Sequence, residues 1–351
     1  MASSFLLYGA NGYTGEITAR QAAQQGLRPV LAGRHRELIE NLGRELDLET
    51  RVFALDDSAD IDKNLQDVAA VLHCAGPFAH TAKPMAEACI RNHVHYLDIT
   101  GEIGVFESLA RRDAQAQSAG ITLMPGVGFD VVPTDCLAAH LKRRMPNATR
   151  LTLAFRGIGK TSRGTTLTMI ENIARGGAVR RNGKIIPVPA AWRTRHIDFG
   201  RGNVNCITIP WGDVSTAFYS TGIPNIEVYS AFPASVQRGM MAARYLGWLL
   251  GSAPVQQFLK TQVEKRITGP STDERARGLS LVWGQVEDEA GNQMTSRMKT
   301  PDGYALTVLT SLESVRRLLA GNVPTGFQTP SRAFGADFIM EFDGVTREDV
   351  P

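Results

Sequence analysis

The stretch LLYGANGYTGEI, residues 6–17, carries glycines at intervals of three directly after an apolar run. Gly9 suits a tight turn with positive φ, Gly12 lets a ligand approach the backbone, and Gly15 lets a helix pack closely on the preceding strand. The spacing is G-x-x-G-x-x-G rather than G-x-G-x-x-G, but its place after a first strand predicts a dinucleotide turn more than an ordinary tight loop. A helix that begins here offers free N–H groups to a pyrophosphate. The expected cofactor contacts in this turn are Gly9, Asn11, Gly12, Tyr13, Thr14 and Gly15.

The first third of the chain alternates short apolar runs with segments of helical period, which is typical of βαβ units. Strands rich in Val, Leu and Ile without polar alternation fit a sheet that is covered on both faces. The pattern therefore predicts an α/β fold with a doubly wound parallel sheet. We expect strands at residues 5–10, 28–33, 51–56, 69–76, 95–100 and 121–126, and helices near 14–26, 35–47, 59–67, 81–93 and 104–118.

Beyond about Pro133, runs of β-branched and aromatic residues predict a second, α+β domain with a mainly antiparallel sheet and helices on one face. Thr134 is the expected N-cap of a helix at the start of this domain. The expected domains are residues 1–132 and 133–322. Strands are expected at 150–157, 204–212, 225–232, 279–288 and 294–300, and helices at about 165–175, 234–250, 253–265 and 303–320.

Composition is that of a globular protein, with 43% hydrophobic and 21% charged residues. The four cysteines are scattered, which favours free thiols in a reducing compartment, and we expect a cytoplasmic protein without a secretory signal. The apolar stretch at residues 239–255 is interrupted by Arg244 and is shorter than the ~20 residues that span a bilayer. An amphipathic core helix explains this stretch better than lipid association, so no integral membrane span is expected.

The tip of the second predicted strand decides between the two nicotinamide dinucleotides. An NAD site would place an acidic residue there, whereas this strand ends in Gly33 and Arg34. A guanidinium can hold a 2′-phosphate through paired charge-assisted bonds, so Arg34 argues for NADP. For Arg36, the position of a solvated residue at the start of a helix is a better interpretation than contact with the 2′-phosphate. Asp56, at the end of the third strand, either contacts the adenine side or caps the next helix.

Three further strand ends reach the same edge of the sheet, where the nicotinamide is expected. The fourth strand ends in HCAGPF, and Cys74, Ala75, Gly76 and Pro77 are the expected contacts with the nicotinamide ribose. A proton donor is required, because hydride transfer needs one and the nicotinamide does not supply it. The candidates on this edge are Tyr96, Asp98, Glu102 and Asp130, of which Tyr96, Asp98 and Asp130 are our choice as catalytic residues. Tyr96 can instead only pack, and both aspartates can instead only bind loop backbone.

The chain resembles the saccharopine dehydrogenase-like oxidoreductases, and among them the short bacterial members similar to trans-acting enoyl reductases. The resemblance rests on GANGYTG, AGR, CAGPF, YLDITGE, PGVGFDVVPTD, GPSTDER, GYALT and TPSRAFG, in that order along nearly the whole length. It implies a Rossmann domain that binds NADP, an α+β domain, and a C-terminal segment, residues 323–351, that returns to the first domain. It also implies hydride transfer to an enoyl or imino substrate, and a homodimer is a guess from its sheet-rich second domain.

The segment from Lys142 to Gly202 holds fourteen basic and two acidic residues, against a net charge of +3 for the whole chain. This excess suits a small anionic substrate or an acidic partner such as an acyl carrier protein, although a solvated basic face is the plain alternative. Arg156, Lys160 and Arg163 are the expected substrate contacts. Aromatic residues are not interleaved with the basic ones, so nucleic acid is not an expected partner. No metal-ligand spacing is present among the histidines, and without an evident acid–base constellation a non-catalytic NADP-binding scaffold is the alternative to an enzyme.

Overall fold

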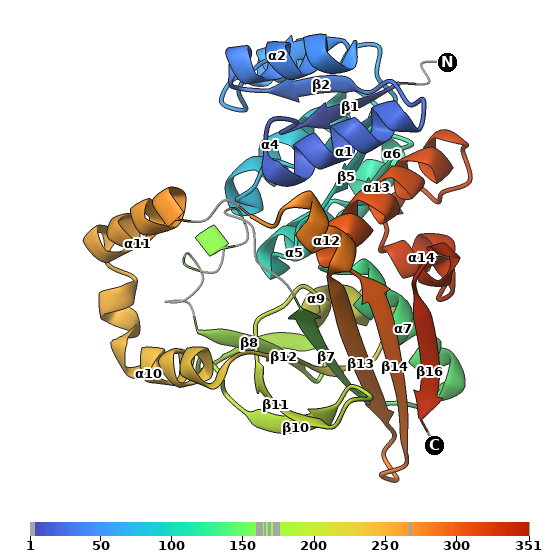
Figure 1. Cartoon of the computed structure of the whole chain (residues 1–351). Coiled ribbons are helices and arrows are strands. Elements are labelled where there is room, and N and C mark those ends of the chain that lie inside the picture. Colours follow the sequence, from blue (N-terminus) through green and yellow to red (C-terminus); the bar gives the residue numbers. More distant parts are fainter. Residues whose placement is uncertain are drawn as a thin grey trace. The chain divides into compact units, whose positions relative to one another are not determined.

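The structure, a computed structural model, describes residues 4–350 except 159–163, 165, 168, 169, 171–175, 267 and 268. It divides into two compact units (Figure 1). Unit 1 comprises residues 1–130 and 306–334, and unit 2 comprises residues 131–305 and 335–351.

Unit 1 is built on a parallel sheet in the order β15-β6-β5-β4-β1-β2-β3, with β1 at the point where the strand order reverses. This is the expected Rossmann-type arrangement, and ligands of such sheets bind beyond the carboxyl ends of the strands at the reversal. The strands are β1 (Phe5–Tyr8), β2 (Val30–Gly33), β3 (Thr50–Val52), β4 (Ala70–His73), β5 (His95–Asp98), β6 (Thr122–Met124) and β15 (Gly326–Phe327). The helices are α1 (Tyr13–Gln24), α2 (Arg36–Leu46), α3 (Ser58–Asn64), α4 (Phe78–Arg91), α5 (Ile103–Ala110), α6 (Asp113–Ser118), α13 (Gly303–Leu319) and α14 (Pro330–Phe334).

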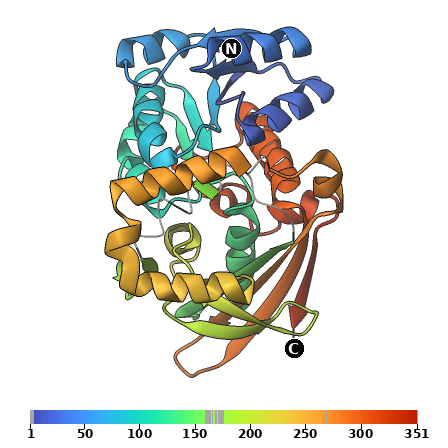
Figure 2. The same cartoon turned by 60° about the vertical axis from the view of Figure 1, so that its left-hand side comes forward.

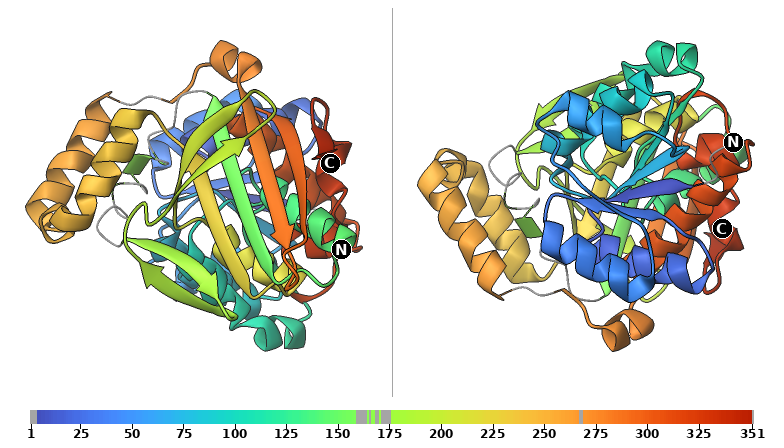
Figure 3. Two further views of the ribbon diagram at one scale, coloured as in Figure 1. Left: turned by 90° about the horizontal axis from the view of Figure 1, so that it is seen from below. Right: turned by 90° about the horizontal axis from the view of Figure 1, so that it is seen from above.

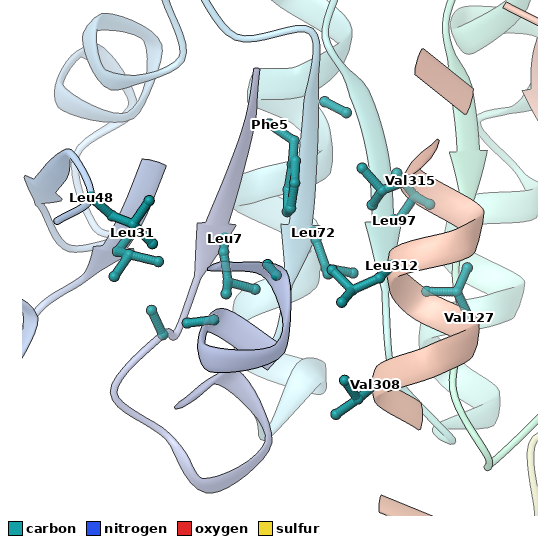
Figure 4. Close-up of a cluster of buried hydrophobic side chains, with 14 of the residues drawn as sticks. Phe5, Leu7, Leu31, Leu48, Leu72, Leu97, Val127, Val308, Leu312 and Val315 are labelled. Carbon is teal, nitrogen blue, oxygen red and sulfur yellow. The ribbon is translucent and has the colours of Figure 1, made fainter. Parts of the chain in front are cut away.

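The core of unit 1 explains why the chain is divided differently from the expected ranges. Figure 4 shows Leu7, Leu72 and Leu97 of the sheet packed with Leu312 and Val315 of α13. Because α13 buries its apolar side chains there, unit 1 takes in residues that the sequence had placed in the second domain.

The last part of the chain is also divided between the two units. Strand β15 pairs with β6 in unit 1, whereas β16 (Thr346–Val350) pairs with β14 in unit 2. The expected return of residues 323–351 to the first domain therefore holds only up to Phe334, and the residues after it belong to unit 2.

Unit 2 holds a mixed, mostly antiparallel sheet in the order β10-β11-β12-β7-β13-β14-β16, in which β12 and β7 are parallel and β8 pairs with β12 and β9. The long strands lie side by side in the left view of Figure 3. The strands are β7 (Arg150–Ile158), β8 (Gly177–Arg181), β9 (Lys184–Val188), β10 (Thr194–Asp198), β11 (Asn203–Thr208), β12 (Asn225–Ala231), β13 (Leu279–Glu287) and β14 (Gln293–Pro301).

One face of this sheet is covered by α7 (Val132–Arg144) and α9 (Asp213–Thr221). The approach of α7 is close, since a Cβ added at Gly284 of β13 would lie 2.7 Å from a methyl carbon of Leu141. Helices α10 (Ala234–Leu250) and α11 (Ala253–Arg266) come forward in Figure 2, and α12 (Thr272–Arg277) precedes β13.

Most expected elements are present in the structure, with several local differences. The expected helix at 104–118 is two helices, α5 and α6, and β8, β9, β10 and β16 were not expected. The expected helix at 165–175 falls largely outside the described residues. Thr134 is not an N-cap: Val131 takes that position, and the Thr134 hydroxyl donates to its carbonyl at 3.0 Å. All four cysteines are free thiols. Among the described residues, the helices are too short or too polar to cross a bilayer.

Candidate functional site

The glycine turn follows β1 and is held by backbone hydrogen bonds. The N–H groups of Gly9 and Ala10 donate to the carbonyl of Ala32 in β2, at 2.7 and 3.1 Å, and the N–H of Gly12 donates to the carbonyl of Gly9 at 3.0 Å. Gly9 has φ of 84°, the left-handed conformation expected of it. The turn thus lies between the ends of β1 and β2 before any ligand binds.

Close contacts explain the glycines. A Cβ at Gly9 would lie 2.7 Å from the Ala75 backbone nitrogen, and one at Gly15 would lie 2.1 Å from the Gly9 carbonyl oxygen. Gly12 differs, because it is exposed and an added Cβ would meet only the Gly9 oxygen, at 3.3 Å. As N-cap of α1 it has no side chain to cap the helix, so it leaves the first turn of α1 open to an anion.

The other residues of the turn take different positions. Asn11 is partly buried against the end of β2, because its Oδ1 lies 2.9 Å from where a Cβ at Gly33 would be. Tyr13 and Thr14 begin α1 and are both partly exposed.

At the tip of β2, Arg34 is exposed, and its Nε–H donates to Nε2 of His35 at 3.3 Å. None of the carboxylates in the described part of the chain pairs with Arg34. Arg36 instead begins α2 and pairs with Glu40 at 2.8 Å, as expected of a solvated residue at a helix start. A guanidinium without a carboxylate remains available for a phosphate.

Asp56 is exposed after β3, and its suggested capping role is wrong. The N-cap of α3 is Asp57, whose carboxylate accepts from the Ala59 N–H at 2.9 Å. Burial raises the pKa of the Tyr8 hydroxyl to about 12, while the Arg34 charge lowers it and the Asp56 charge raises it. Both charges therefore act on the same hydroxyl at the end of β1.

The loop after β4 borders the glycine turn. The N–H of Cys74 donates to the Tyr8 carbonyl at 2.8 Å, and the carbonyl of Ala75 accepts from the Thr81 hydroxyl at 2.7 Å. Gly76 is exposed, and Pro77 is the N-cap of α4. Burial raises the pKa of the Cys74 thiol well above its usual range, with a smaller effect of Asp98, so this thiol stays protonated.

Tyr96 and Asp98 are completely buried on one face of β5. The Tyr96 hydroxyl donates to Oδ2 of Asp98 at 2.8 Å, and the N–H groups of Thr100 and Gly126 donate to Oδ1, both at 2.9 Å. Burial raises the pKa of Asp98 to about 7 although these three donors lower it. The pKa of Tyr96 is raised well above its usual range by burial and then by Asp98. Asp98 thus joins the loops after β5 and β6.

Glu102 and Asp130 lie on the loops that follow. Glu102 accepts from the N–H groups of Phe78 and Ala79, at 2.8 and 2.9 Å, and so caps α4 with both oxygens. Asp130 is partly exposed, and its Oδ2 lies 2.9 Å from where a Cβ at Gly101 would be. Burial of the carboxyl, and then the charge of Glu102, raise the pKa of Asp130 to about 7.

His73, at the end of β4, was missed by the sequence reasoning. It is completely buried, and neither ring nitrogen has a hydrogen-bond partner. Its neighbours are the rings of Tyr8, Phe78 and Tyr96, at centroid distances of 5.4, 5.3 and 6.2 Å. Burial lowers its pKa to about 3, so the ring is neutral. The signal was a histidine closing an otherwise apolar strand, which spacing rules for metal ligands do not detect.

Two further histidines, just before and at the start of β5, have structural partners. His93 takes a φ of 57° and its Nδ1 contacts the Ala119 carbonyl at 2.9 Å, while Nδ1 of His95 accepts from the Thr122 N–H at 3.0 Å. No group of His, Cys, Asp and Glu suited to a metal ion occurs among the residues that the structure describes.

The expected substrate contacts lie in unit 2. Arg156 is on β7 and partly exposed, whereas Lys160 and Arg163 fall outside the described residues. Two described basic residues of unit 2, Arg181 and Arg193, both pair with the carboxylate of Glu227.

Comparison with known proteins identifies the nucleotide-binding part. Residues 5–124 match the family model of the saccharopine dehydrogenase NADP binding domain. This part of the chain is a saccharopine dehydrogenase-type NADP-binding domain. The expected family resemblance and the expected cofactor, NADP, are confirmed for this domain.

Curated relatives match over part of the chain. The saccharopine dehydrogenase-like oxidoreductase of Homo sapiens is 27% identical over 160 residues, which are 40% of this chain and 37% of that protein. The trans-acting enoyl reductase of Mycobacterium leprae is 30% identical over 148 residues, which are 40% of this chain and 35% of that protein. The chain thus covers little more than a third of the length of these relatives, and both are named as oxidoreductases, as the resemblance predicts.

The fold of the whole chain resembles that of a solved relative. The saccharopine dehydrogenase (L-Glu forming) from Saccharomyces cerevisiae superposes with a TM-score of 0.69 at 13% identity, over 99% of this chain and 100% of that one. The similarity confirms the expected fold class, a Rossmann-type domain combined with an α+β domain.

Proposed function

We propose that the protein is an NADP-dependent oxidoreductase that adds a hydride and a proton across the double bond of an enoyl or imino substrate. The observation that carries the proposal is the open N-terminus of α1 beside Arg34, a guanidinium without a carboxylate partner in the described part of the chain. The free thiols favour a cytoplasmic protein, and a homodimer remains our expectation.

The residues present fit the cofactor. The N-terminus of α1, where Gly12 provides no side-chain cap, would receive the pyrophosphate, and Arg34 would hold the 2′-phosphate. Asp56 would contact the adenine side, where its charge already acts on Tyr8. When bound, NADPH supplies the hydride. The proposed contacts are Gly9, Asn11, Gly12, Tyr13, Thr14, Gly15, Arg34, Asp56, Cys74, Ala75, Gly76 and Pro77.

Asp130 is the proton donor that we favour among the three candidates. The residue as a whole is partly exposed, and burial of its carboxyl raises the pKa to about 7, which leaves much of it protonated near neutral pH. Tyr96 and Asp98 are completely buried and bound to each other, so they are better suited to position the loops after β5 and β6. Asp130 would release its proton to the reduced substrate and recover one from water.

The substrate class rests on the relatives and on charge. The mycobacterial relatives named trans-acting enoyl reductases favour an enoyl substrate, which the basic residues of unit 2 would suit if it is anionic or tethered to an acidic carrier. The relatives named saccharopine dehydrogenase-like oxidoreductases keep reduction of a C=N bond as the second candidate. A non-catalytic NADP-binding scaffold is the remaining alternative.

The test is NADPH oxidation by the purified full chain, followed at 340 nm, with an enoyl thioester and with a cyclic imine. We expect turnover of the thioester and a rate that falls above pH ~7 as Asp130 loses its proton. Asp130→Asn should reduce the rate by about 100-fold and remove that fall, while NADPH affinity stays unchanged. Turnover of the imine alone would select the second candidate, and no turnover of either would favour a scaffold.

A further inference from the structure

The second unit carries a row of polar side chains across one face of its sheet. Glu227 of β12 pairs in register with Thr152 of β7, which pairs with Gln285 of β13. Gly284 faces α7, because a Cβ there would contact Leu141. Since neighbouring residues of a strand point to opposite faces, Gln285 and its row lie on the face away from α7.

Two arginines converge on the carboxylate in this row. Arg181 and Arg193 both donate to Oε1 of Glu227, the latter at 3.0 Å, and the Tyr229 hydroxyl donates to Oε2 at 2.5 Å. Glu227 is only 8% exposed, so its carboxylate is held in one position by these partners. We call Arg181, Arg193 and Arg195 the arginine cluster.

In the described part of the chain, the third member of the arginine cluster has neutral hydrogen-bond partners, and its charge also lowers the pKa of Glu287. Arg195 donates to Oε1 of Gln285 at 2.5 Å and to the Thr152 hydroxyl at 3.3 Å. Its charge and that of Arg193 both lower the pKa of the Tyr229 hydroxyl, which burial and Glu227 raise well above its usual range. Arg195 and Arg193 therefore act on the same small volume.

Indole rings hold the guanidiniums in place. Arg193 and Arg181 lie 4.2 and 5.6 Å from the ring of Trp192, and Arg195 lies 5.1 Å from that of Trp283. Such cation–π contacts lower the mobility of the arginines without neutralising them.

The charges do not balance within the cluster. Arg181, Arg193, Arg195 and Glu227 together carry a net charge of +2, and Glu287, a carboxylate on which the Arg195 charge also acts, is itself paired with Arg150. One arginine would be enough to pair Glu227, and a second adds repulsion that structure alone does not require. The Arg193 side chain is 54% exposed, so an anion from solvent can reach it.

We infer that the arginine cluster binds an oxyanion, a phosphate or a carboxylate, carried by the substrate or by the molecule that delivers it. Arginine forks pair with both groups through two parallel hydrogen bonds. Arg156, an expected substrate contact, lies on the same face of β7, because it follows Thr152 by four positions and alternate residues of a strand share a face. The inference rests on the proposed function and specifies that its substrate is anionic.

Binding can be measured without catalysis, because Trp192 touches two members of the cluster. Intrinsic fluorescence of the full chain is titrated with inorganic phosphate and with succinate, at ionic strength held constant with sodium chloride. We expect a saturable change with at least one probe, lost in Trp192→Phe. Stronger binding of phosphate points to a phosphate group, and stronger binding of succinate to a carboxylate.

Variants separate a site from general charge. Arg193→Ala and Arg193→Gln should each lower the affinity for the anion by about tenfold. The glutamine variant keeps a hydrogen-bond donor for Glu227. Arg143→Ala is the matched control, because Arg143 is 56% exposed and pairs with a single carboxylate, Asp337, on α7's side of the unit. It should leave the titration unchanged.

The inference is overturned if neither anion differs from chloride, if Arg143→Ala has the same effect as Arg193→Ala, or if light scattering shows a dimer that Arg193→Ala dissociates. The titration contains no NADPH. If the anion titration is saturable but the protein has no reductase activity, the proposed function is refuted and the anion site stands. If the protein reduces an anionic substrate and Arg193→Gln leaves that activity unchanged, the anion site alone is refuted.

Discussion

Replacing His73 with leucine should make the protein more stable, although His73 is completely buried at the end of β4, the middle strand of the sheet. Two ring nitrogens are buried without partners, and an unsatisfied buried polar group costs about 1–3 kcal/mol. Leucine fills similar space among Tyr8, Phe78 and Tyr96 without polar atoms. At pH 8, where the histidine is neutral in both states, His73→Leu should raise the free energy of unfolding by about 1–3 kcal/mol.

The gain should grow on acidification. The pKa of His73 falls from 6.5 in the unfolded chain to about 3 in the folded one, so the unfolded state binds the extra proton between these values. Wild-type stability is therefore lost as pH falls below 6.5, by about 2 kcal/mol at pH 5, and this loss is absent from the variant. Asp98, whose pKa is raised to about 7, gives the opposite slope, but it is present in both proteins and cancels in the difference.

Urea unfolding followed by circular dichroism at pH 8 and pH 5 measures both effects. His80→Leu, at an exposed position on α4, is the control and should leave the difference between the two pH values as in the wild type. A destabilised His73→Leu at pH 8, or a difference from wild type that is equal at both pH values, would refute the reasoning.

Two further substitutions test packing and capping in unit 1. Gly15→Ala places a methyl group 2.1 Å from the Gly9 oxygen, so it should lower the free energy of unfolding by about 1–3 kcal/mol and lower the affinity for NADPH. The control is Gly104→Ala in α5, where an added Cβ would have nothing within 4 Å. This control should be neutral or slightly stabilising in the same unfolding assay. Equal effects of the two would contradict the packing argument. Glu102→Ala removes both acceptors at the start of α4 and should cost about 1 kcal/mol, and it should also lower the pKa of Asp130, measured by carbon-13 NMR of the carboxyl. An unchanged Asp130 titration would show that the two carboxylates do not interact.

The Rossmann-type unit was predictable because its signals are local. Apolar runs such as residues 69–76, separated by helical segments, fix a parallel sheet, and Gly9 and Gly15 of the turn have the conformational and steric reasons that their spacing predicts. The division of the chain into its two units was harder to predict from the sequence. That α13 packs on the first sheet depends on contacts between Leu312 and strands more than two hundred residues earlier, which periodicity does not contain.

The candidate site was predictable in position and less so in role. Tyr96 and Asp98 lie on β5 and Asp130 follows β6, but exposure separates them, because Tyr96 and Asp98 are completely buried and Asp130 is partly exposed. The sequence also could not show that Glu102 caps α4, since its partners precede it by a whole helix and strand. The arginine cluster was visible only as an excess of charge, because β8 and β10 were not recognised as strands.

The central claim is that Arg34 holds the 2′-phosphate of NADP beside the open N-terminus of α1. The most direct test is calorimetric titration of wild type, Arg34→Ala and Arg36→Ala with NADPH and NADH. We expect wild type to prefer NADPH, Arg34→Ala to lose about 10–100-fold in NADPH affinity with NADH unchanged, and Arg36→Ala to resemble wild type. Preference of the wild type for NADH, or NADPH affinity that survives Arg34→Ala, would contradict the account.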